Sequence, residues 1–561
     1  MVEVRYGPID QRPYAFGTGL SSRTPAHPTT VDLRPASTAT AETKVYQVLI
    51  PLLRCIFFTI CFLTIAIVAA RLVFHVPHSA DQKETLALPP VANNALTAAV
   101  TKSAQERLGL TGIASLEDGR HAFAARILLA NAAVSSIDVQ YYIWRADMTG
   151  HLLLKALYRA ANRGVRVRLL LDDNGIDGLD DVLAAMDAHR NMEVRLYNPF
   201  ILRRFKRLSF AFDFFRLNHR MHNKAFTVDG CVCILGGRNV GDEYFGTGTN
   251  PLQIDLDVLA IGDIVPRISA DFDRYWNSDA VIPARQILGK FGNTGVIATV
   301  LAGFETAPDF NDYRPLLDDS DIVSSLERGD LALEWTEAVL VSDDPVIGFG
   351  GLPRSELFVN RLLAAVGPIM NRFDGVTPYF VPGEAGVKAF AALQNRGVSV
   401  RMLTNSLEAT DVMPVHAGYA KRRKDLLRAG VGLFELHPQP GGPTSLDKIG
   451  PFGSSGSHLH AKTFAVDGNR VFVGSFNFDP RSATLNTEMG LLIQSTRMAE
   501  RLHDAFDSGL GDLAWRVEMR EGRLIWTGAS NGAETDVEPG TTFLNRAALT
   551  LIGWLPVEWL L

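Results

Sequence analysis

The sequence contains little cysteine, and its cysteines are not spaced as a disulfide framework. Only four occur among 561 residues. Cys55 and Cys61 lie in an apolar run, while Cys231 and Cys233 stand two apart in a strand-like stretch, where side chains share a face but are poorly placed to bridge. The pattern therefore excludes a disulfide-stabilised secreted scaffold and leaves the redox compartment open.

An excess of basic residues is also lacking. The chain has 55 Lys and Arg against 61 Asp and Glu, which gives a formal net charge of −6. Proteins that surround nucleic acid usually draw affinity from a basic excess, so the composition argues against that class, although a local basic patch would be enough. The mean hydropathy of +0.07 is high for a wholly soluble enzyme and directs attention to a membrane segment.

One long apolar run supplies that segment. No charged residue occurs from Cys55 to Ala70, and apolar residues continue on both sides past Arg54 and Arg71. The run provides the ~20 residues that a membrane-spanning helix needs if the arginine side chains extend to the interfaces. We therefore expect three N-terminal segments: a disordered arm (1–43), a transmembrane helix (44–75) and a linker (76–104).

Two other interpretations of the apolar run stay open. A signal peptide cleaved near Ala80 is disfavoured because the preceding arm is longer than a normal n-region, and a buried core helix is the weaker alternative. Lys44 and Arg54 on one side balance Arg71 and Lys83 on the other, so charge does not indicate the orientation in the membrane.

Beyond the linker the chain reads as two similar halves. Strand signals at 136–144 and 376–381 are followed by helical spacing at 152–163 and 385–394, an α/β alternation typical of a largely parallel sheet covered by helices. The expected segments are a first half (105–282), an insertion (283–354), a second half (355–510), and a C-terminal hairpin with an apolar tail (511–561).

The strongest feature is one motif that occurs once in each half. His222-Asn-Lys224-Ala-Phe-Thr-Val-Asp229 matches His460-Ala-Lys462-Thr-Phe-Ala-Val-Asp467. A glycine and an asparagine follow fourteen and seventeen residues after each histidine, namely Gly236 and Asn239, then Gly474 and Asn477. One copy would be a weak signal, but two copies in matching register are a strong one.

Strand geometry separates the residues of each copy into two groups. Residues two apart in a strand face the same way, so the histidine and lysine of each copy share a face. Asp229 and Asp467 come an odd number of positions later and precede glycine, as in a two-residue hairpin turn. We interpret both aspartates as turn formers outside the reacting groups.

Two facing His–Lys pairs suit a reaction at a phosphodiester. One imidazole attacks phosphorus and forms a covalent phosphohistidine, while the opposite histidine protonates the leaving alcohol and later takes a proton from the acceptor. Lys224 and Lys462 would hold the non-bridging oxygens, and Asn239 and Asn477 would donate further hydrogen bonds. No metal or other cofactor is expected, because the lysines supply the positive charge.

Each imidazole also needs a partner on its second nitrogen to fix the tautomer, and a carboxylate on a neighbouring strand is the natural choice. Asp255 and Asp257 follow the first motif and Glu488 follows the second; of these we favour Asp255 and Glu488.

Three further histidines are given lesser roles. His458 shares a face with His460, but no cysteine or carboxylate stands at close spacing, so a zinc pair is the weaker interpretation. His219 and His416 are expected to border the pocket at most.

The paired motifs resemble the HKD signature of the phospholipase D superfamily, over nearly the whole chain after the linker. More narrowly, six segments are similar to those of bacterial cardiolipin synthases of the C type: 220–226, 236–245, 255–259, 272–278, 378–384 and 415–419. The resemblance implies a bilobal, pseudo-twofold α/β fold with two mixed or parallel sheets flanked by helices and one active site at the seam.

The resemblance also implies an activity, namely transfer of a phosphatidyl group to phosphatidylglycerol. His222 would then be the nucleophile and His460 the general acid and base, although pseudo-symmetry makes this assignment reversible. Gly237 stands where the second half has Ser475, so the two sides of the site are not equivalent donors, and Ser475 is added to the expected substrate-binding residues.

Three features favour a lipid substrate. They are the apolar run, the mixture of basic and aromatic residues over 200–215, and the tail 548–561 with Trp554 and Trp559. The basic and aromatic stretch taken alone could equally bind single-stranded nucleic acid, and the tail could equally be a helix packed on the core.

The sequence thus predicts an enzyme anchored in the bacterial inner membrane that makes cardiolipin. Phosphatidylglycerol would be the acceptor and phosphatidylglycerol or phosphatidylethanolamine the donor, with no nucleic acid partner and with one chain sufficient for one site. The first alternative is a phospholipase D that gives the intermediate to water. A nuclease and a non-catalytic membrane scaffold are the remaining alternatives.

Overall fold

The computed structural model describes most of the chain after the arm. The described residues are 39–77, 83–92, 94–247, 252–289, 320–346, 353–410, 412–437, 458–510, 513–528, 532–555 and 558–561. The predicted disordered arm up to residue 38, the alternative cleavage residue Ala80 and much of the predicted insertion lie outside them. The chain divides into two compact units, Met1–Ile67 and Val68–Leu561.

The apolar run forms one helix, α1 (Ala39–Val73). Its part from Leu49 to Val73 has a mean hydropathy of 2.5 with none of that window buried, so it is long and apolar enough to cross a membrane. No other helix of 18 residues or more in the described part of the chain passes the same test.

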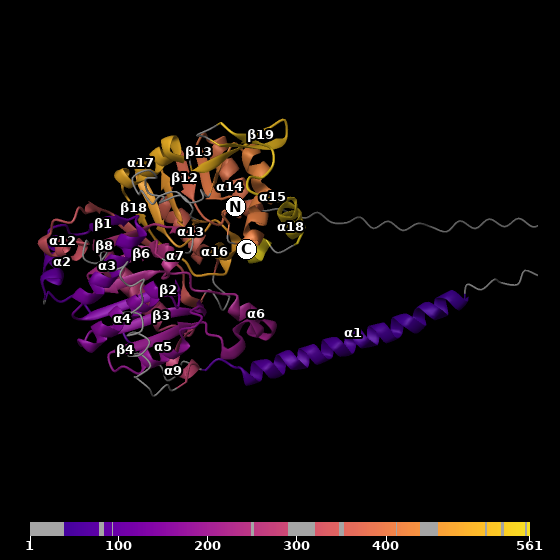
Figure 1. The fold of residues 1–561 in the computed structure, drawn as a ribbon, viewed down its shortest axis with the longest axis horizontal. Helices are drawn as coiled ribbons and strands as arrows, with labels where there is room; N and C mark the ends of the chain where they lie inside the picture. Colours follow the sequence, from indigo (N-terminus) through magenta and orange to yellow (C-terminus); the bar gives the residue numbers. More distant parts are fainter. Residues whose placement is uncertain are drawn as a thin grey trace, which may run out of the picture. The chain divides into compact units, whose positions relative to one another are not determined.

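The first half is built on a large sheet whose helices are drawn in indigo to magenta in Figure 1. Helices α3 (Gly119–Ala132), α4 (Met148–Asn162), α5 (Asp180–Asp187) and α8 (Ile264–Trp276) accompany it. The strand order is β10 (Glu334–Thr336), β1 (Thr111–Leu116), β8 (Asp257–Gly262), β6 (Val232–Gly236), β5 (Ala225–Val228), β2 (Ser136–Ile143), β3 (Arg166–Gly175), β4 (Met192–Tyr197), β9 (Val281–Pro283).

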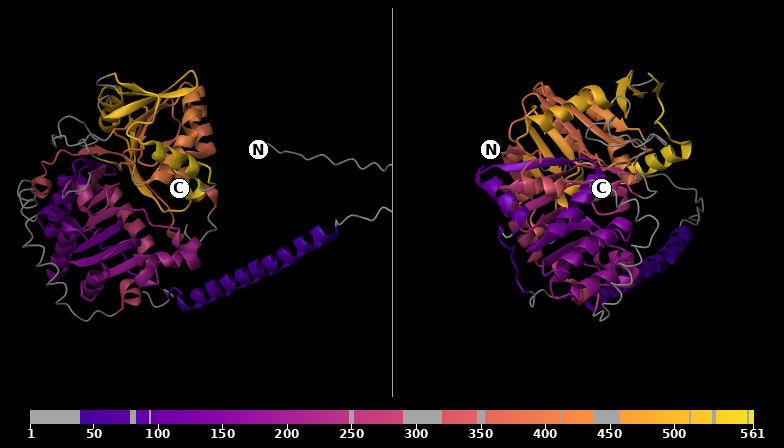
Figure 2. Two further views of the ribbon diagram at one scale, coloured as in Figure 1. Left: turned by 45° about the vertical axis from the view of Figure 1, so that its right-hand side comes forward. Right: turned by 60° about the vertical axis from the view of Figure 1, so that its left-hand side comes forward.

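The second half repeats this arrangement, as the orange and yellow elements of Figures 1 and 2 show. Its helices include α13 (Phe358–Val366), α14 (Gly383–Asn395), α15 (Met413–Arg428), α16 (Pro480–Thr484), α17 (Thr496–Asp504) and α18 (Phe543–Gly553). The strand order is β11 (Ala338–Ser342), β18 (Met489–Ile493), β17 (Arg470–Gly474), β16 (Thr463–Val466), β12 (Arg372–Val376), β13 (Ser399–Asn405), β14 (Gly432–Leu436), β19 (Ala514–Arg520), β20 (Arg523–Gly528), β21 (Glu534–Thr535).

Both large sheets are mixed, which confirms the fold class. Parallel pairing within them is confined to β2–β3–β4 and to β12–β13–β14, where helices such as α4 and α14 provide the crossover that parallel strands require. The short turns that join β5 to β6 and β16 to β17 impose antiparallel pairing instead. The alternation of strands and helices alone suggested a largely parallel sheet, and this expectation is wrong, because most strand pairs in both sheets are antiparallel.

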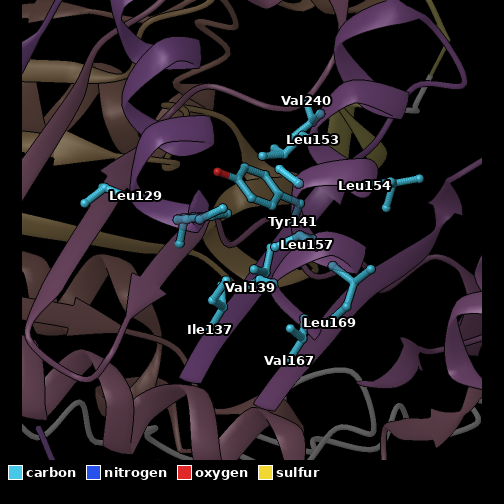
Figure 3. Packing of buried hydrophobic residues seen from close by; sticks show 14 of the residues in the cluster. Leu129, Ile137, Val139, Tyr141, Leu153, Leu154, Leu157, Val167, Leu169 and Val240 are labelled. Atoms are coloured by element: carbon cyan, nitrogen blue, oxygen red, sulfur yellow. The ribbon is translucent and has the colours of Figure 1, made fainter. Parts of the chain in front are cut away.

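The two sheets share a core. Alternate residues of β6 point in opposite directions, so that Val232 and Ile234 join the core of the first half, part of which appears in Figure 3. Cys233 and Leu235 join a second cluster that also contains Val473 of β17. This seam core fixes the halves face to face, and a small parallel sheet of β7 (Gln253–Ile254) and β15 (His458–Leu459) adds backbone hydrogen bonds between them.

The segments between the predicted halves contribute structure of their own. The predicted linker contains helix α2 (Ala95–Gln105), which Asn94 caps by accepting a hydrogen bond from Thr97 N. In the predicted insertion, β10 extends the first sheet and β11 extends the second, so this part of the chain passes from one half to the other.

Candidate active site

His222 lies on the segment that leads into β5, at the contact between the halves. Its backbone N–H donates to the carbonyl of Thr487 over 2.9 Å. Its ring nitrogen Nδ1 is 2.9 Å from Oε2 of Glu488, which is fully buried immediately before β18. The histidine of the first half is thus held by a carboxylate of the second.

His460 occupies the corresponding place after β15. Its backbone N–H donates to the carbonyl of Ile254 over 2.8 Å, and its Nδ1 is 2.5 Å from Oδ2 of the buried Asp255. Here a carboxylate of the first half holds the histidine of the second, so the arrangement is reciprocal.

Strand register shows that the two carboxylates are structural equivalents. Gly236 of β6 pairs with Asp257 of β8, and Gly474 of β17 pairs with Gly490 of β18. Two residues before these partners stand Asp255 and Glu488. Asp257, the alternative weighed from sequence, instead forms buried ion pairs with Arg126 (2.8 Å) and Arg238 (3.1 Å) and so belongs to the scaffold.

The two lysines lie beside the histidines of their own motifs. Lys224 Nζ donates to the carbonyl of His222 over 2.5 Å, and Lys462 Nζ lies 2.8 Å from Nδ1 of His460. Both lysines are almost completely buried. Burial, followed by the Lys462 ammonium, holds the pKa of Lys224 well below its usual range.

The same charges act on both imidazoles. Burial, then Lys224, then Lys462 hold the pKa of His222 well below its ordinary value. Burial, Lys462, Lys224 and the His222 ring do the same for the pKa of His460. Groups of both halves thus act on each ring, and neutral imidazoles keep a nitrogen lone pair for attack.

The pKa of Glu488 is shifted in the opposite direction. Burial raises the pKa of Glu488 to about 8, although the Lys224 ammonium and the Ser475 hydroxyl favour its charged form. Burial likewise raises the pKa of Asp255 against the opposing charge of Lys462.

Three residues were expected to bind substrate. Asn239 accepts a hydrogen bond from Ile143 N over 3.2 Å, and its buried Nδ2 has no acceptor in the described residues except the neighbouring Tyr244 hydroxyl. Asn477 is buried, with Thr377 Oγ1 at 3.5 Å from its Oδ1. The Ser475 hydroxyl donates to the Glu488 carboxylate, so in this structure it orients that carboxylate.

Gly237 stands where the second half has Ser475, and this difference has a steric cause. A Cβ atom there would lie 2.2 Å from Oδ1 of Asp255. The first half therefore combines a shorter carboxylate with glycine, and the second half combines Glu488 with Ser475.

Asp229 and Asp467 lie in the hairpin turns, with φ of 49° and 52°. The carboxylate of Asp229 accepts hydrogen bonds from the backbone N–H groups of residues 134, 135 and 136. Asp467 accepts them from residues 370, 371 and 372. Each aspartate thus fixes the entry to the adjoining central strand.

Sequence reasoning missed two tyrosines. Tyr142 packs edge-on against His222 with ring centroids 5.0 Å apart, and Tyr244 packs against His460 at 5.1 Å. Both belong to the first half, so the pseudo-symmetry of the motifs gave no signal for them. A search for aromatic residues at the ends of the strands beside each motif could have found Tyr142.

The other histidines have partners outside the reacting groups. Nδ1 of His219 contacts the carbonyl of Leu485 at 2.8 Å, His416 pairs with Glu538, and Nδ1 of His458 contacts the carbonyl of Ala409. The described residues contain no group of three or more His, Cys, Asp or Glu side chains placed to hold a metal ion.

Comparisons with known proteins agree on one family. A family model described as cardiolipin synthase, PLD-like domain, matches residues 127–276 and 369–510. The chain is 46% identical over 470 residues to cardiolipin synthase C of Escherichia coli, which covers 83% of this chain and 99% of that protein.

Two further relatives are more distant. A Helicobacter pylori protein described as uncharacterized is 31% identical over 77% of this chain and 86% of its own. Cardiolipin synthase of Oceanobacillus iheyensis is 26% identical over 71% of this chain and 68% of its own.

Proposed function

The chain belongs to the family of cardiolipin synthases with phospholipase D-like domains, and from this premise we propose that it makes cardiolipin by transphosphatidylation. The observation that supports this proposal best is the reciprocal arrangement in which Glu488 contacts His222 and Asp255 contacts His460. It leaves the Nε2 atoms of two buried imidazoles available to one phosphodiester.

The first half-reaction uses His222 as the nucleophile. With the Nδ1 hydrogen of His222 donated to Glu488, its Nε2 lone pair attacks phosphorus. The P–N bond forms as the bond from phosphorus to the head-group oxygen of the donor breaks. His460, in its protonated form, gives its Nε2 proton to that oxygen, and the head-group alcohol leaves.

The second half-reaction reverses these steps with a new alcohol. His460 takes the proton from a hydroxyl of phosphatidylglycerol, whose oxygen attacks phosphorus while the P–N bond breaks. His222 regains its lone pair and His460 its proton, so the enzyme is ready for another cycle. The donor is phosphatidylglycerol or phosphatidylethanolamine, because both carry a phosphodiester with an alcohol leaving group.

The lysines and asparagines stabilise the negative charge of the substrate phosphate. A substrate phosphate brings a negative charge between Lys224 and Lys462, which favours protonation of His460 over the ligand-free state. Nδ2 of Asn239 and the amide of Asn477 are the donors for the non-bridging oxygens. Asp255 and Glu488 are positioning carboxylates, and Ser475 supports Glu488.

The setting is a membrane, with phospholipids as substrates. We place the chain in the bacterial inner membrane, held by the single span Leu49–Val73, and one chain provides all the groups of one site.

Product analysis tests the proposal. The full-length protein is incubated with liposomes of phosphatidylglycerol and phosphatidylethanolamine that carry different acyl chains, and the products are identified by mass spectrometry. We expect cardiolipin, and acyl chains from both lipids in one molecule would identify phosphatidylethanolamine as a donor. Phosphatidic acid without cardiolipin would contradict the proposal and identify a hydrolase. His222→Ala and His460→Ala should form neither product.

A trapping experiment tests the intermediate. Enzyme quenched during turnover of ³²P-labelled lipid should carry an acid-labile adduct on His222, mapped by peptide analysis. Absence of any adduct during demonstrated turnover would exclude the covalent route.

A further inference from the structure

Two segments near the active site expose large apolar side chains to solvent. The first comprises the 3₁₀ helix η2 (Arg203–Ser209) and helix α6 (Phe210–Leu217), where Phe205, Leu208 and Phe215 are 60%, 59% and 72% exposed. The second is the end of α18 and the two residues after it, where Leu551, Trp554 and Leu555 are 61%, 78% and 54% exposed. We name these six side chains the apolar rim. Exposed apolar side chains that lie together can mark an interaction surface.

A single arginine connects the residues that follow α6 with the last two residues of the chain. The guanidinium of Arg481 donates to the carbonyl and Oδ1 of Asn218, directly after α6, over 3.0 and 2.6 Å. It also donates to the carbonyl of Leu560 over 3.0 Å, and its backbone N–H donates to the carbonyl of Leu561. Figure 1 and the left view of Figure 2 show α6 and α18 on the same side of the unit Val68–Leu561.

This connection lies close to the candidate active site. Asn218 stands four residues before His222, and Arg481 stands four residues after Asn477. Both parts of the apolar rim are therefore attached to the chain segments that carry the reacting groups.

The C-terminal end of α1, the candidate membrane-spanning helix, contacts helix α6. Arg71, in the last turn of α1, donates its Nε–H to the carbonyl of Phe212 in α6 over 2.6 Å. Phe74, the residue after α1, stacks on the Phe212 ring with centroids 5.7 Å apart. Because Leu49–Val73 is apolar enough to span a bilayer, α6 is held where the chain would leave the membrane.

The basic residues of η2 also favour a bilayer as the neighbour of this surface. Arg203 and Lys206 are paired with Asp180 and Asp173. Arg204 and Arg207 are exposed, and no carboxylate lies within ion-pair distance of either among the described residues. Two guanidinium groups without a carboxylate partner, one of them 5.7 Å from the centroid of the Phe205 ring, suit the anionic surface of a bilayer better than an uncharged partner.

We propose that the apolar rim docks on the bilayer in which the chain is anchored, with its side chains among the acyl chains and Arg204 and Arg207 at the lipid phosphates. Docking in this position brings the active site to the level of the lipid head groups, so a phospholipid reaches the histidines without leaving the membrane. The proposal concerns the surface and holds whichever reaction the site performs.

Nitroxide accessibility in reconstituted protein tests the proposal. Cys55 and Cys61 are replaced by serine in the full-length chain, and Cys231 and Cys233 are buried. A spin label is then introduced by Phe215→Cys, Leu555→Cys or, as a matched control, Met370→Cys, which changes a residue 66% exposed in the second half. The proteins are reconstituted in vesicles containing phosphatidylglycerol.

We expect labels at 215 and 555 to be several-fold more accessible to oxygen than to a water-soluble nickel complex, and the label at 370 to show the reverse. Equal accessibility of all three positions to the nickel complex would overturn the proposal and assign the apolar rim to water or to a soluble partner.

A charge-reversal variant tests the role of the arginines with the same readout. Arg204→Glu with Arg207→Glu should lower the oxygen preference of the label at 215 in anionic vesicles, whereas Arg396→Glu with Arg428→Glu, also exposed, should leave it unchanged. An unchanged preference in the first variant would remove the lipid phosphates from the proposal. Neither readout depends on turnover, so a failure of the proposed reaction is distinguishable from a failure of the docking surface.

Discussion

At the scale of single residues, each imidazole has one nitrogen bound to a carboxylate and one left for chemistry. Glu488 and Asp255 accept from Nδ1 of His222 and His460 when they are ionised. In the proposed reaction this hydrogen bond fixes the tautomer that presents Nε2 to phosphorus. In that proposal the carboxylates affect the reaction without touching the substrate.

Glu488→Gln is expected to lower kcat/KM for cardiolipin formation by about 10²- to 10⁴-fold, because an amide fails to select the reactive tautomer of His222. Steady-state assays on vesicles measure the loss, and thermal melts check that the variant is folded. Glu384→Gln, which changes an exposed carboxylate that pairs with Lys388, is the control and should retain activity. A folded Glu488→Gln enzyme with unchanged kcat/KM would exclude the orienting role.

The Glu488 pKa of about 8 predicts a pH dependence. The reactive tautomer needs ionised Glu488, so kcat/KM should rise with pH through this value. Because the Ser475 hydroxyl stabilises the ionised form, Ser475→Ala should raise the pKa and move the rise to higher pH by about one unit, equivalent to one hydrogen bond.

Thr463→Val supplies a matched control for this shift, because Thr463 is also a buried hydroxyl but donates to the carbonyl of Phe472. Its pH profile should follow that of the unmodified enzyme. If the Ser475→Ala and Thr463→Val profiles coincide, the hydroxyl has no influence on the ionisation of Glu488.

At the scale of elements, the aspartates of the two Asp-Gly hairpins hold the starts of the neighbouring central strands β2 and β12. Asp467 and Gly468 both have positive φ, and the Asp467 carboxylate accepts hydrogen bonds from three backbone N–H groups at the start of β12. These hydrogen bonds lower the pKa of Asp467 against the effect of its burial. The motif aspartates thus serve the fold, although they complete the HKD pattern.

Asp467→Ala is expected to reduce the free energy of unfolding by about 1–3 kcal/mol, because three N–H donors lose their acceptor and alanine disfavours positive φ. Activity per folded molecule should stay close to that of the unmodified protein. Chemical denaturation and active-site titration measure the two quantities. Asp263→Ala, which removes an exposed pair with Arg267, should change stability by less than about 0.5 kcal/mol. A stable but inactive Asp467→Ala protein would assign this residue to the chemistry.

At the scale of the whole molecule, the site exists only where the halves meet. The seam core and the β7–β15 pair fix the halves, and both imidazole–carboxylate contacts of the candidate active site cross between them. We infer that one chain is sufficient for one site.

Mixing inactive variants tests this inference. Full-length His222→Ala and His460→Ala proteins, reconstituted together in one vesicle population, should remain as inactive as each alone, since neither chain contains both imidazoles. Cardiolipin formation by the mixture would show that two chains contribute to one site. A co-reconstituted unmodified protein provides the positive control.

Local sequence determined much of this protein. The histidine and lysine of each motif share a face because strand side chains alternate, and the aspartates enter turns because Asp-Gly adopts positive φ. The duplicated register identified both halves, and the apolar run identified the candidate span. These features depend on short local patterns or on the repetition of one such pattern along the chain, so spacing alone predicts them.

Only the tertiary structure decided which groups meet. His222 and Glu488 are 266 positions apart, and His460 and Asp255 are 205 apart. Their crossed pairing follows from the packing of one sheet on the other. The same packing placed Tyr142 and Tyr244 against the imidazoles and turned Ser475 towards Glu488. No local pattern encodes these contacts, because they depend on how two separately formed surfaces fit together.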